Sequence, residues 1–215
     1  MQKEFWLERW ELNQIPFHQL KANPRLTQNF AALGLAAGAR VFVPLCGKSL
    51  DVHWLLGHGY QVVGAELSRI AVEQLFRELG CEPSVTEAGA LTRFEAPGII
   101  VYQGSIFELT EALLGPVDAV YDRAALVALP EPMRSQYAPL VMALTHLAPQ
   151  LLVCFEYDES CMDGPPFSIR EPEVRRRYEG SYEVRLLEHV TSEMLRGTCP
   201  SEESVWLLTP LAQRP

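Results

Sequence analysis

The sequence predicts an α/β fold built on a mostly parallel sheet, and three observations support this prediction. Short apolar runs at residues 40–44 and 60–66 are each followed by a segment with helical spacing, as expected of successive strand–helix units. The run at residues 151–157 is almost entirely apolar, which is typical of a strand covered on both faces. Two later runs, at residues 182–187 and 205–208, have no clear helix between them, so we expect an antiparallel pair at the sheet edge.

The segment before the first strand, residues 1–38, predicts a helical cover. Trp6 and Trp10 recur at helical spacing. Asn23 followed by Pro24 is typical of a helix start, because asparagine caps the first turn and proline fits its first position. A second helix is therefore expected at residues 26–35.

The remaining elements follow in chain order. The turn after the first strand leads into a short helix at residues 50–56, and Ser68 is expected to cap a helix that ends at Gly80. Further strands are predicted at residues 99–102, with a hairpin partner near 91–95, and at residues 117–121. Further helices are predicted at residues 132–147 and 171–178. A loop is predicted at residues 163–167.

Length and composition indicate one domain spanning residues 1–215. The net charge of −9 would repel a phosphate backbone, and the basic cluster Arg175–Arg177 is surrounded by glutamates. The five cysteines form no C-x-x-C pair and the five histidines show no H-E-x-x-H spacing, so neither a metal site nor a disulfide framework is predicted. With no long apolar run, we expect a cytoplasmic monomer that binds neither nucleic acid nor membrane.

The turn after the first strand predicts a cofactor site at the carboxyl ends of the first two strands. Gly47-Lys48-Ser49 imitates the end of a phosphate-binding loop, but Phe42 occupies the place of the leading glycine, which excludes a triphosphate cradle. A dinucleotide fingerprint needs several glycines, so NAD(P) is poorly supported. S-adenosylmethionine needs no phosphate cradle, and Glu66, about 20 residues beyond the turn, lies where a carboxylate reaches a ribose diol.

Other residues at predicted strand ends are candidates for the same site. Arg123 ends a buried strand, where its guanidinium suits either a ligand carboxylate or an ion pair with an acid such as Asp122. Ser105 and Ile106 follow the strand at 99–102 and are candidates to place backbone amides and an apolar wall beside an adenine. The N-terminal aromatic residues fit either a lid over a positive sulfur or ordinary core packing: Phe5, Trp6, Trp10 and Phe17.

Short motifs spread over nearly the whole chain point to a known family. In order they are Trp6 and Trp10 with Phe17-His18-Gln19, then Val-Pro-Leu-Cys-Gly-Lys at 43–48, Val-Gly-Ala-Glu at 63–66, Ser-Ile-Phe at 105–107, Tyr-Asp-Arg-Ala-Ala-Leu-Val-Ala at 121–128 and Gly-Pro-Pro-Phe at 164–167. Together these motifs resemble the thiopurine S-methyltransferase family, in its bacterial form.

The resemblance implies the class I methyltransferase fold, which is Rossmann-like. It has a seven-stranded, mostly parallel sheet with an antiparallel last strand, here with an N-terminal helical lid. The resemblance also implies which residues contact S-adenosylmethionine and substrate. Trp10, Leu45, Glu66 and Arg123 would contact the cofactor, Trp6, Ser105 and Ile106 would lie near it, and Phe17 would lie against the substrate.

The implied activity is methyl transfer to the sulfur of a small aromatic or heterocyclic thiol such as a thiopurine, or to selenium or tellurium species. We expect in-line displacement without a metal, because the donor is already activated. Asp122 is a candidate proton acceptor and Arg123 a candidate to favour an anionic nucleophile. A related thiol, thiocyanate or halide methyltransferase and a non-catalytic S-adenosylmethionine-binding protein stay open as alternatives. The segment around Arg196 departs from the animal enzymes' pattern, which leaves the substrate open.

Overall fold

The computed structural model describes residues 3–192, 194–195 and 197–212. The chain divides into two compact units, each made of two separate stretches. The first unit comprises Met1–Gln28 and Leu35–Asp118, and the second comprises Asn29–Gly34 and Ala119–Pro215. Within the described ranges, no helix is long and apolar enough to cross a membrane.

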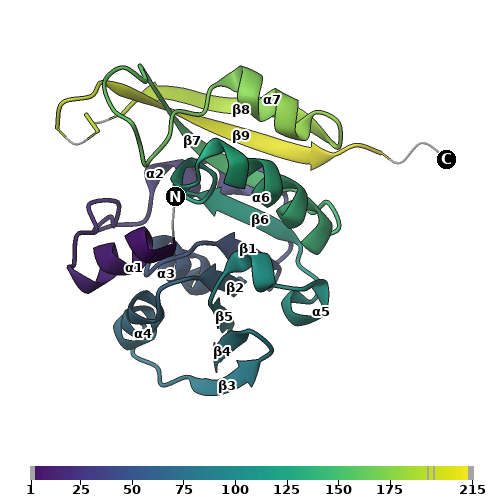
Figure 1. Cartoon of the computed structure of the whole chain (residues 1–215). Coiled ribbons are helices and arrows are strands. Elements are labelled where there is room, and N and C mark those ends of the chain that lie inside the picture. The colour runs from purple at the N-terminus through teal and green to yellow at the C-terminus, as the bar shows by residue number, and fades with distance from the viewer. Residues whose placement is uncertain (1–2, 193, 196, 213–215) are drawn as a thin grey trace. The chain divides into compact units, whose positions relative to one another are not determined.

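The sheet of the first unit consists of β1 (Arg40–Pro44), β2 (Gln61–Glu66), β3 (Ser84–Ala88), β4 (Leu91–Ala96) and β5 (Ile99–Gln103), shown in Figure 1. Their order is β3-β4-β5-β2-β1. β2 pairs parallel with both β1 and β5, whereas β3, β4 and β5 form an antiparallel meander. Because β1, β2 and β5 run in one direction, their carboxyl ends lie at the same edge of the sheet.

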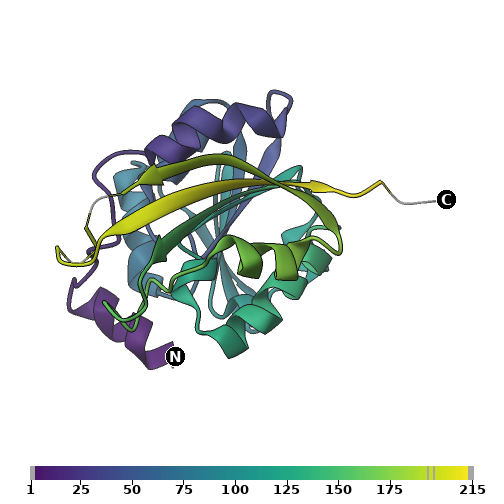
Figure 2. The same ribbon diagram turned by 90° about the horizontal axis from the view of Figure 1, so that it is seen from above.

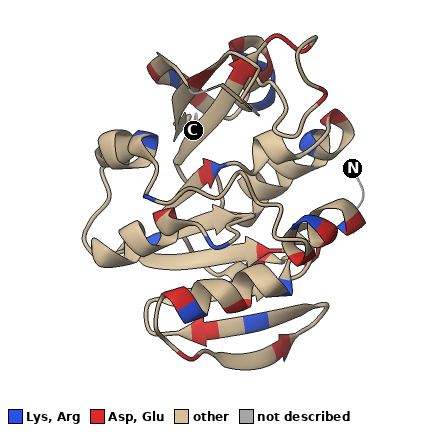
Figure 3. Ribbon diagram, turned by 90° about the vertical axis from the view of Figure 1, so that its left-hand side faces the viewer, with Lys and Arg blue, Asp and Glu red and all other residues tan. Residues whose placement is uncertain are grey.

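Helices connect the parallel strands of this unit. α3 (Leu50–Gly57) follows β1, and α4 (Arg69–Glu78) follows β2. Both begin at serine caps: the Ser49 hydroxyl accepts from the Asp51 N–H, and the Ser68 hydroxyl accepts from the Ala71 N–H. Charged residues are frequent on α4 and on the β3–β4 hairpin, as Figure 3 shows. A 3₁₀ turn, η2 (Ile106–Glu108), and a short helix, α5 (Glu111–Leu114), follow β5.

The N-terminal segment contains α1 (Lys3–Glu11) and α2 (Pro24–Asn29), and α2 is followed by a 3₁₀ turn, η1 (Phe30–Leu33). Asn23 starts α2 as predicted, because its side-chain oxygen accepts a 2.7 Å bond from the Arg25 N–H. The Asn23 N–H in turn donates to the buried Asp51 carboxylate at 2.6 Å, which fixes this segment to α3. The single helix predicted at residues 26–35 is therefore observed as α2 and η1, ending at Gly34 with φ 64°.

The sheet of the second unit consists of β6 (Ala119–Arg123), β7 (Gln150–Tyr157), β8 (Tyr182–Thr191) and β9 (Ser201–Pro210). Their order is β6-β7-β9-β8. β6 and β7 are parallel, and β9 pairs antiparallel with both β7 and β8. Figure 2 shows the long β8–β9 pair from above. The antiparallel pair expected at the end of the chain is thus confirmed.

Helices α6 (Glu131–Leu144) and α7 (Glu171–Tyr178) of the second unit lie beside each other (Figures 1 and 2). A 3₁₀ turn, η3 (Leu126–Ala128), precedes α6. α6 ends three residues earlier than predicted, since His146 and Leu147 adopt φ values of 50° and 61° that no right-handed helix accommodates. The basic cluster 175–177 lies on α7, and Arg175 pairs with Glu171 at 2.6 Å, so the cluster belongs to a charged helix face.

The described residues contain nine strands, whereas the resemblance implies seven. The difference arises at the β3–β4 hairpin. β4 corresponds to the hairpin partner predicted near residues 91–95. β3 lacks a clear strand signal because all of its residues except Ala88 are exposed.

Candidate active site

The turn between β1 and α3 is held in an unusual conformation. Leu45 and Gly47 have φ values of 48° and 52°, in the left-handed region that L side chains rarely adopt. The Cys46 N–H donates to the Ala65 carbonyl at 3.1 Å, and so attaches the turn to β2. Strained backbone of this kind is frequent where a chain approaches a ligand closely.

Glu66, the last residue of β2, is the central polar group of this turn. Its Oε2 accepts a 2.8 Å bond from the Gly47 N–H, and its Oε1 accepts a 2.7 Å bond from the Ser68 N–H. The side chain is buried, and burial raises the pKa of the carboxyl, while the N–H groups of Ser68, Gly47 and Leu67 oppose this rise. Each carboxylate oxygen has further acceptor capacity, so Glu66 is able to receive the two hydroxyls of a ribose.

Trp10 lies against the same turn. A Cβ added at Gly47 would stand 3.2 Å from the Trp10 ring, so only glycine leaves the indole in place there. The Trp10 and Phe17 ring centroids are 5.7 Å apart, and those of Trp6 and Phe17 are also 5.7 Å apart, both edge to face. Trp6, Trp10 and Phe17, here called the aromatic cluster, are therefore brought together in the first unit.

The turn after β5 is attached to the end of β2. The Gly104 N–H donates to the Glu66 carbonyl at 2.8 Å, and Gln103 Nε2 donates to the Leu67 carbonyl at 2.9 Å. Ser105 then caps η2 by accepting from the Phe107 N–H, and Ile106 is buried. The first unit therefore holds the turn at 45–47, Glu66 and the turn at 104–106 at neighbouring strand ends, an arrangement that fits an adenosyl group without phosphates.

Cys46, which lies in the strained turn, has the properties of a packing residue. Its Sγ lies 2.7 Å from the position that a Cβ at Gly64 would occupy, so glycine in β2 provides the space for the thiol. Burial, together with the Glu66 charge, raises the pKa of the Cys46 thiol well above its usual value. A protonated, buried thiol is a poor nucleophile, so Cys46 serves to pack the turn rather than to react.

The second unit holds Asp122 and Arg123 at the end of β6. Asp122 is buried; its Oδ2 accepts a 2.6 Å bond from the Tyr137 hydroxyl on α6, and its Oδ1 accepts from the Leu126 N–H at 3.2 Å. Burial raises the pKa of Asp122 to about 6, although these donors oppose the rise. Arg123 is half-buried at the strand end.

Tyr137 and Arg134, both on α6, were not predicted from the sequence, and both hold motif residues. Arg134 donates to the Leu129 carbonyl at 2.7 Å and to Glu173 on α7 at 2.7 Å. Its guanidinium lies 5.5 Å from the Phe167 ring centroid, and the Phe167 N–H donates to the Val127 carbonyl at 2.6 Å. The Gly-Pro-Pro-Phe motif is thereby held beside the motif at 121–128. Arg196 lies outside the described residues.

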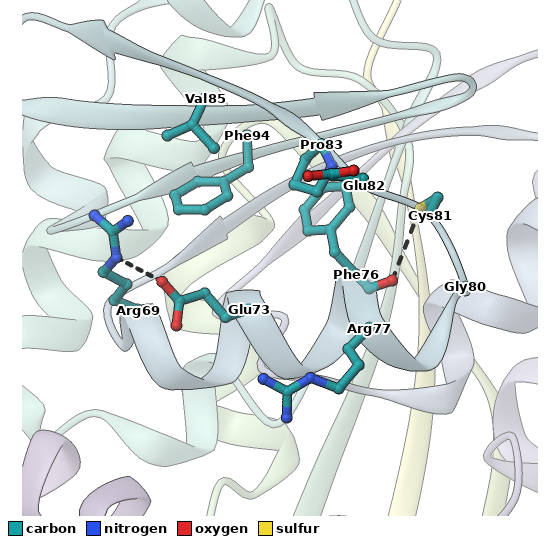
Figure 4. A pocket seen from close by; sticks show the side chains of 10 residues that line it. All are labelled: Arg69, Glu73, Phe76, Arg77, Gly80, Cys81, Glu82, Pro83, Val85 and Phe94. Carbon is teal, nitrogen blue, oxygen red and sulfur yellow. Dashed lines mark hydrogen bonds and ion pairs between the residues drawn. The ribbon is translucent and has the colours of Figure 1, made fainter.

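A shallow surface depression lies elsewhere in the first unit, between α4 and the β3–β4 hairpin (Figure 4). Arg69 and Glu73 form an ion pair at 2.7 Å along its side. The Phe76 and Phe94 rings are stacked with centroids 6.1 Å apart. Its lining residues include none of the predicted site residues.

Solved structures share this fold. A 1,6-didemethyltoxoflavin-N1-methyltransferase from Burkholderia thailandensis, solved with bound 1,6-didemethyltoxoflavin and S-adenosylhomocysteine, matches 96% of this chain and 87% of that chain with a TM-score of 0.66 at 14% identity. A TehB-like S-adenosylmethionine-dependent methyltransferase from Corynebacterium glutamicum matches 97% and 98% with a TM-score of 0.59 at 12% identity. These likenesses show that the chain has the fold of class I S-adenosylmethionine-dependent methyltransferases.

Sequence comparison gives the particular family. Residues 1–206 match the family described as Thiopurine S-methyltransferase. A protein of that name from Xanthobacter autotrophicus is 57% identical over 210 residues, which cover 97% of this chain and 99% of the relative. Another from Gluconobacter oxydans is 49% identical over 208 residues, covering 96% and 94%. The chain belongs to the thiopurine S-methyltransferase family.

Proposed function

We propose that this enzyme methylates the sulfur of small aromatic or heterocyclic thiols such as thiopurines, by in-line displacement. The observation that carries the proposal is the match over nearly full length to a relative named Thiopurine S-methyltransferase at 57% identity. Selenium and tellurium compounds belong to the same proposal, because their anions are nucleophiles of the same kind.

The site residues receive the following proposed roles. S-adenosylmethionine, when bound, supplies a methyl group already activated on a positively charged sulfur. Glu66 accepts hydrogen bonds from the ribose hydroxyls, and the aromatic cluster covers the positive sulfur and excludes water. Phe17 contacts the acceptor ring, and Leu45, Ser105 and Ile106 line the site. Arg123 pairs with a carboxylate of the cofactor.

Positioning supplies most of the proposed catalysis. Holding an acceptor sulfur in line with a methyl group is worth roughly 7–11 kcal/mol of the barrier. Aromatic thiols are acidic enough to ionise in water, so the acceptor requires no strong base. Both Asp122 oxygens already accept bonds from Tyr137 and Leu126, and these contacts support a role in holding the turn after β6. We retain the proton-acceptor role of Asp122 as the alternative.

Further expectations from the sequence belong to the same proposal. The enzyme acts as a cytoplasmic monomer on a small molecule and binds no nucleic acid. Residues 1–215 work as one methyltransferase domain, with residues 1–38 as its cover. The attachment of Asn23 to Asp51 and the packing of Trp10 on the turn at Gly47 support the cover role.

A methyl-acceptor screen tests the proposal. The purified chain is incubated with methyl-labelled S-adenosylmethionine and, separately, with 6-mercaptopurine, a simple aromatic thiol, selenite, tellurite, thiocyanate and halides. Labelled product is expected with the thiols, and methylated selenium or tellurium would extend the range. Turnover of halide or thiocyanate alone would favour the related-methyltransferase alternative. Cofactor binding without product from any acceptor would favour the non-catalytic alternative.

A further inference from the structure

Two cysteines of the second unit lie on segments that are far apart in the sequence. Cys161 lies in the loop between β7 and α7, and Cys199 lies in the turn between β8 and β9. Cys161 is exposed, whereas Cys199 is 1% exposed. Because the Cys161 thiol faces solvent and the Cys199 thiol is covered, the two thiols differ in their accessibility to reagents in solution.

The backbone around each thiol is fixed by local hydrogen bonds. The Cys161 N–H donates to the Asp158 carbonyl at 2.8 Å and closes a turn. Cys199 exchanges two bonds with Leu195: its N–H donates to the Leu195 carbonyl at 3.0 Å, and its carbonyl accepts from the Leu195 N–H at 2.9 Å. Each cysteine is therefore presented from a turn with a defined conformation.

Side-chain packing brings the two turns together. Cys199 is buried in a small cluster with Tyr157 and with Met162, the residue that follows Cys161. The Cys199 thiol donates to the Pro200 carbonyl at 3.8 Å, and the Cys161 side chain lies near enough to raise the pKa of Cys199. The packing of Met162 against Cys199 therefore places its neighbour Cys161 in the same small region of the second unit.

We propose that Cys161 and Cys199 form an oxidant-reactive dithiol site that is converted reversibly to an intrachain disulfide by a peroxide. The Cys161 thiolate attacks one oxygen of the peroxide, the O–O bond breaks, and Cys161 sulfenic acid and hydroxide result. The Cys199 sulfur then attacks the Cys161 sulfur; the S–S bond forms, the S–O bond breaks, and the Cys199 proton leaves with the oxygen as water. A thiol reductant restores both groups.

The roles of the two cysteines follow from their surroundings. Burial and the neighbouring Cys161 raise the pKa of Cys199, so Cys199 stays protonated and reacts second. The buried thiols Cys46 and Cys154 are inaccessible to the oxidant, and burial raises the pKa of both well above the usual value. Cys81 is half-buried, and its thiol donates to the Phe76 carbonyl at 3.9 Å.

The disulfide would tie a family motif to the start of β9. The same β7–α7 loop contains the Gly-Pro-Pro-Phe motif, whose Pro166 carbonyl accepts a 2.6 Å bond from the Tyr157 hydroxyl. Tyr157 is itself part of the cluster around Cys199. Oxidation would therefore replace a packing contact with a covalent link beside this motif.

The test is peptide mapping of the full chain after peroxide treatment. Fully reduced protein is exposed to hydrogen peroxide, free thiols are blocked by N-ethylmaleimide under denaturing conditions, and the digest is analysed without reductant. The expected result is one linked pair of peptides carrying Cys161 and Cys199, with a loss of two of the five free thiols per chain. Dithiothreitol should return all of them.

Three variants complete the design. Cys161→Ser should abolish the linked peptides, whereas Cys81→Ser, a matched change at another partly accessible thiol, should leave them unchanged. Cys199→Ala should leave Cys161 as a sulfenic acid that dimedone labels. The proposal is overturned if wild-type peptides contain Cys161 as a sulfinic acid or in a link between two chains, or if both thiols are still alkylated after treatment.

Discussion

The Gly47 amide and the Glu66 carboxylate are joined by a 2.8 Å hydrogen bond across 19 residues of sequence. The bond connects the turn after β1 to the end of β2, the two places where an open α/β sheet binds its ligand. It thus fixes the orientation of the carboxylate before any cofactor arrives, and preorganisation of this kind reduces the entropy cost of binding.

Replacing Glu66 by glutamine should weaken cofactor binding. The amide group puts an N–H donor where one carboxylate oxygen now accepts from backbone, and it removes the charge that strengthens bonds to ribose hydroxyls. A lost charged hydrogen bond is worth about 1.5–3 kcal/mol, so S-adenosylhomocysteine should bind roughly 10- to 100-fold more weakly by calorimetry. Glu87→Gln on the exposed β3 should bind normally. If both variants bind S-adenosylhomocysteine as tightly as the wild type does, Glu66 does not hold the ribose hydroxyls.

Comparing Gly47→Ala with Gly59→Ala should distinguish two effects: the loss of stability caused by a left-handed φ, and the loss of affinity caused by a lost ligand contact. Gly47 and Gly59 have φ values of 52° and 83°, but a Cβ at Gly59 meets nothing within 4 Å, whereas one at Gly47 meets Trp10. Both substitutions should lower the free energy of unfolding by about 1–2 kcal/mol because of the left-handed φ. Only Gly47→Ala should also weaken S-adenosylhomocysteine binding. An equal loss of affinity in Gly59→Ala would argue against a ligand role for this turn.

The Tyr137–Asp122 bond should make stability depend on pH. Because the pKa of Asp122 rises from 3.8 to about 6 on folding, the folded state binds more protons than the unfolded state between these values. Stability should therefore decrease as pH rises through this window. Above this pH window Asp122 is charged, and its hydrogen-bond donors stabilise the buried charge. Tyr137→Phe should cost about 1–3 kcal/mol of unfolding free energy, and more near pH 8 than near pH 5.

Urea unfolding at the two pH values measures this difference. The nearby groups on α7 and β7, Tyr178 and Cys154, stay protonated over this range because burial and the Asp122 charge raise the pKa of each well above its usual value. Tyr182→Phe is the control, since its hydroxyl donates to the neutral Ala148 carbonyl at 3.0 Å. Its cost should be the same at both pH values. A Tyr137→Phe cost that does not change with pH would show that Asp122 does not titrate between pH 5 and pH 8.

Arg123 should matter more for activity than an arginine on a helix surface. A bidentate bond to a ligand carboxylate is charge-assisted, so Arg123→Ala should lose roughly tenfold or more in methyl transfer. Arg175→Ala, which removes the ion pair with Glu171, should lose little. Initial rates with labelled S-adenosylmethionine measure both. If the two variants lose activity equally, Arg123 has a structural role.

Much of the fold could be predicted because local signals agree with it. β1 begins and ends where the apolar run and Pro44 predict, and α4 begins after its Ser68 cap. β8 and β9 extend beyond the predicted runs. Their outer residues include exposed polar residues that give no clear strand signal and are held in the strands by pairing. β3 lacks a clear signal for the same reason.

Some residues of the candidate site could likewise be predicted from the sequence, and others could not. Glu66 could be predicted because its distance from the turn is set by one strand–helix–strand unit. The contacts of Tyr137 with Asp122 and of Arg134 with Glu173 join residues 15 and 39 positions apart. A tyrosine and an arginine on a helix have no local pattern that distinguishes such partners from solvent, so only the tertiary structure identifies them.

The order of strands in the second unit also bears on how the chain is made. β9 is synthesised after both β7 and β8, yet it lies between them and pairs with both along their length. Until β9 has been synthesised, β8 has no neighbour among the described strands and β7 has one open edge. A nascent chain of this enzyme must therefore carry an unpaired strand until β9 has been synthesised, and unpaired strand edges are prone to aggregation.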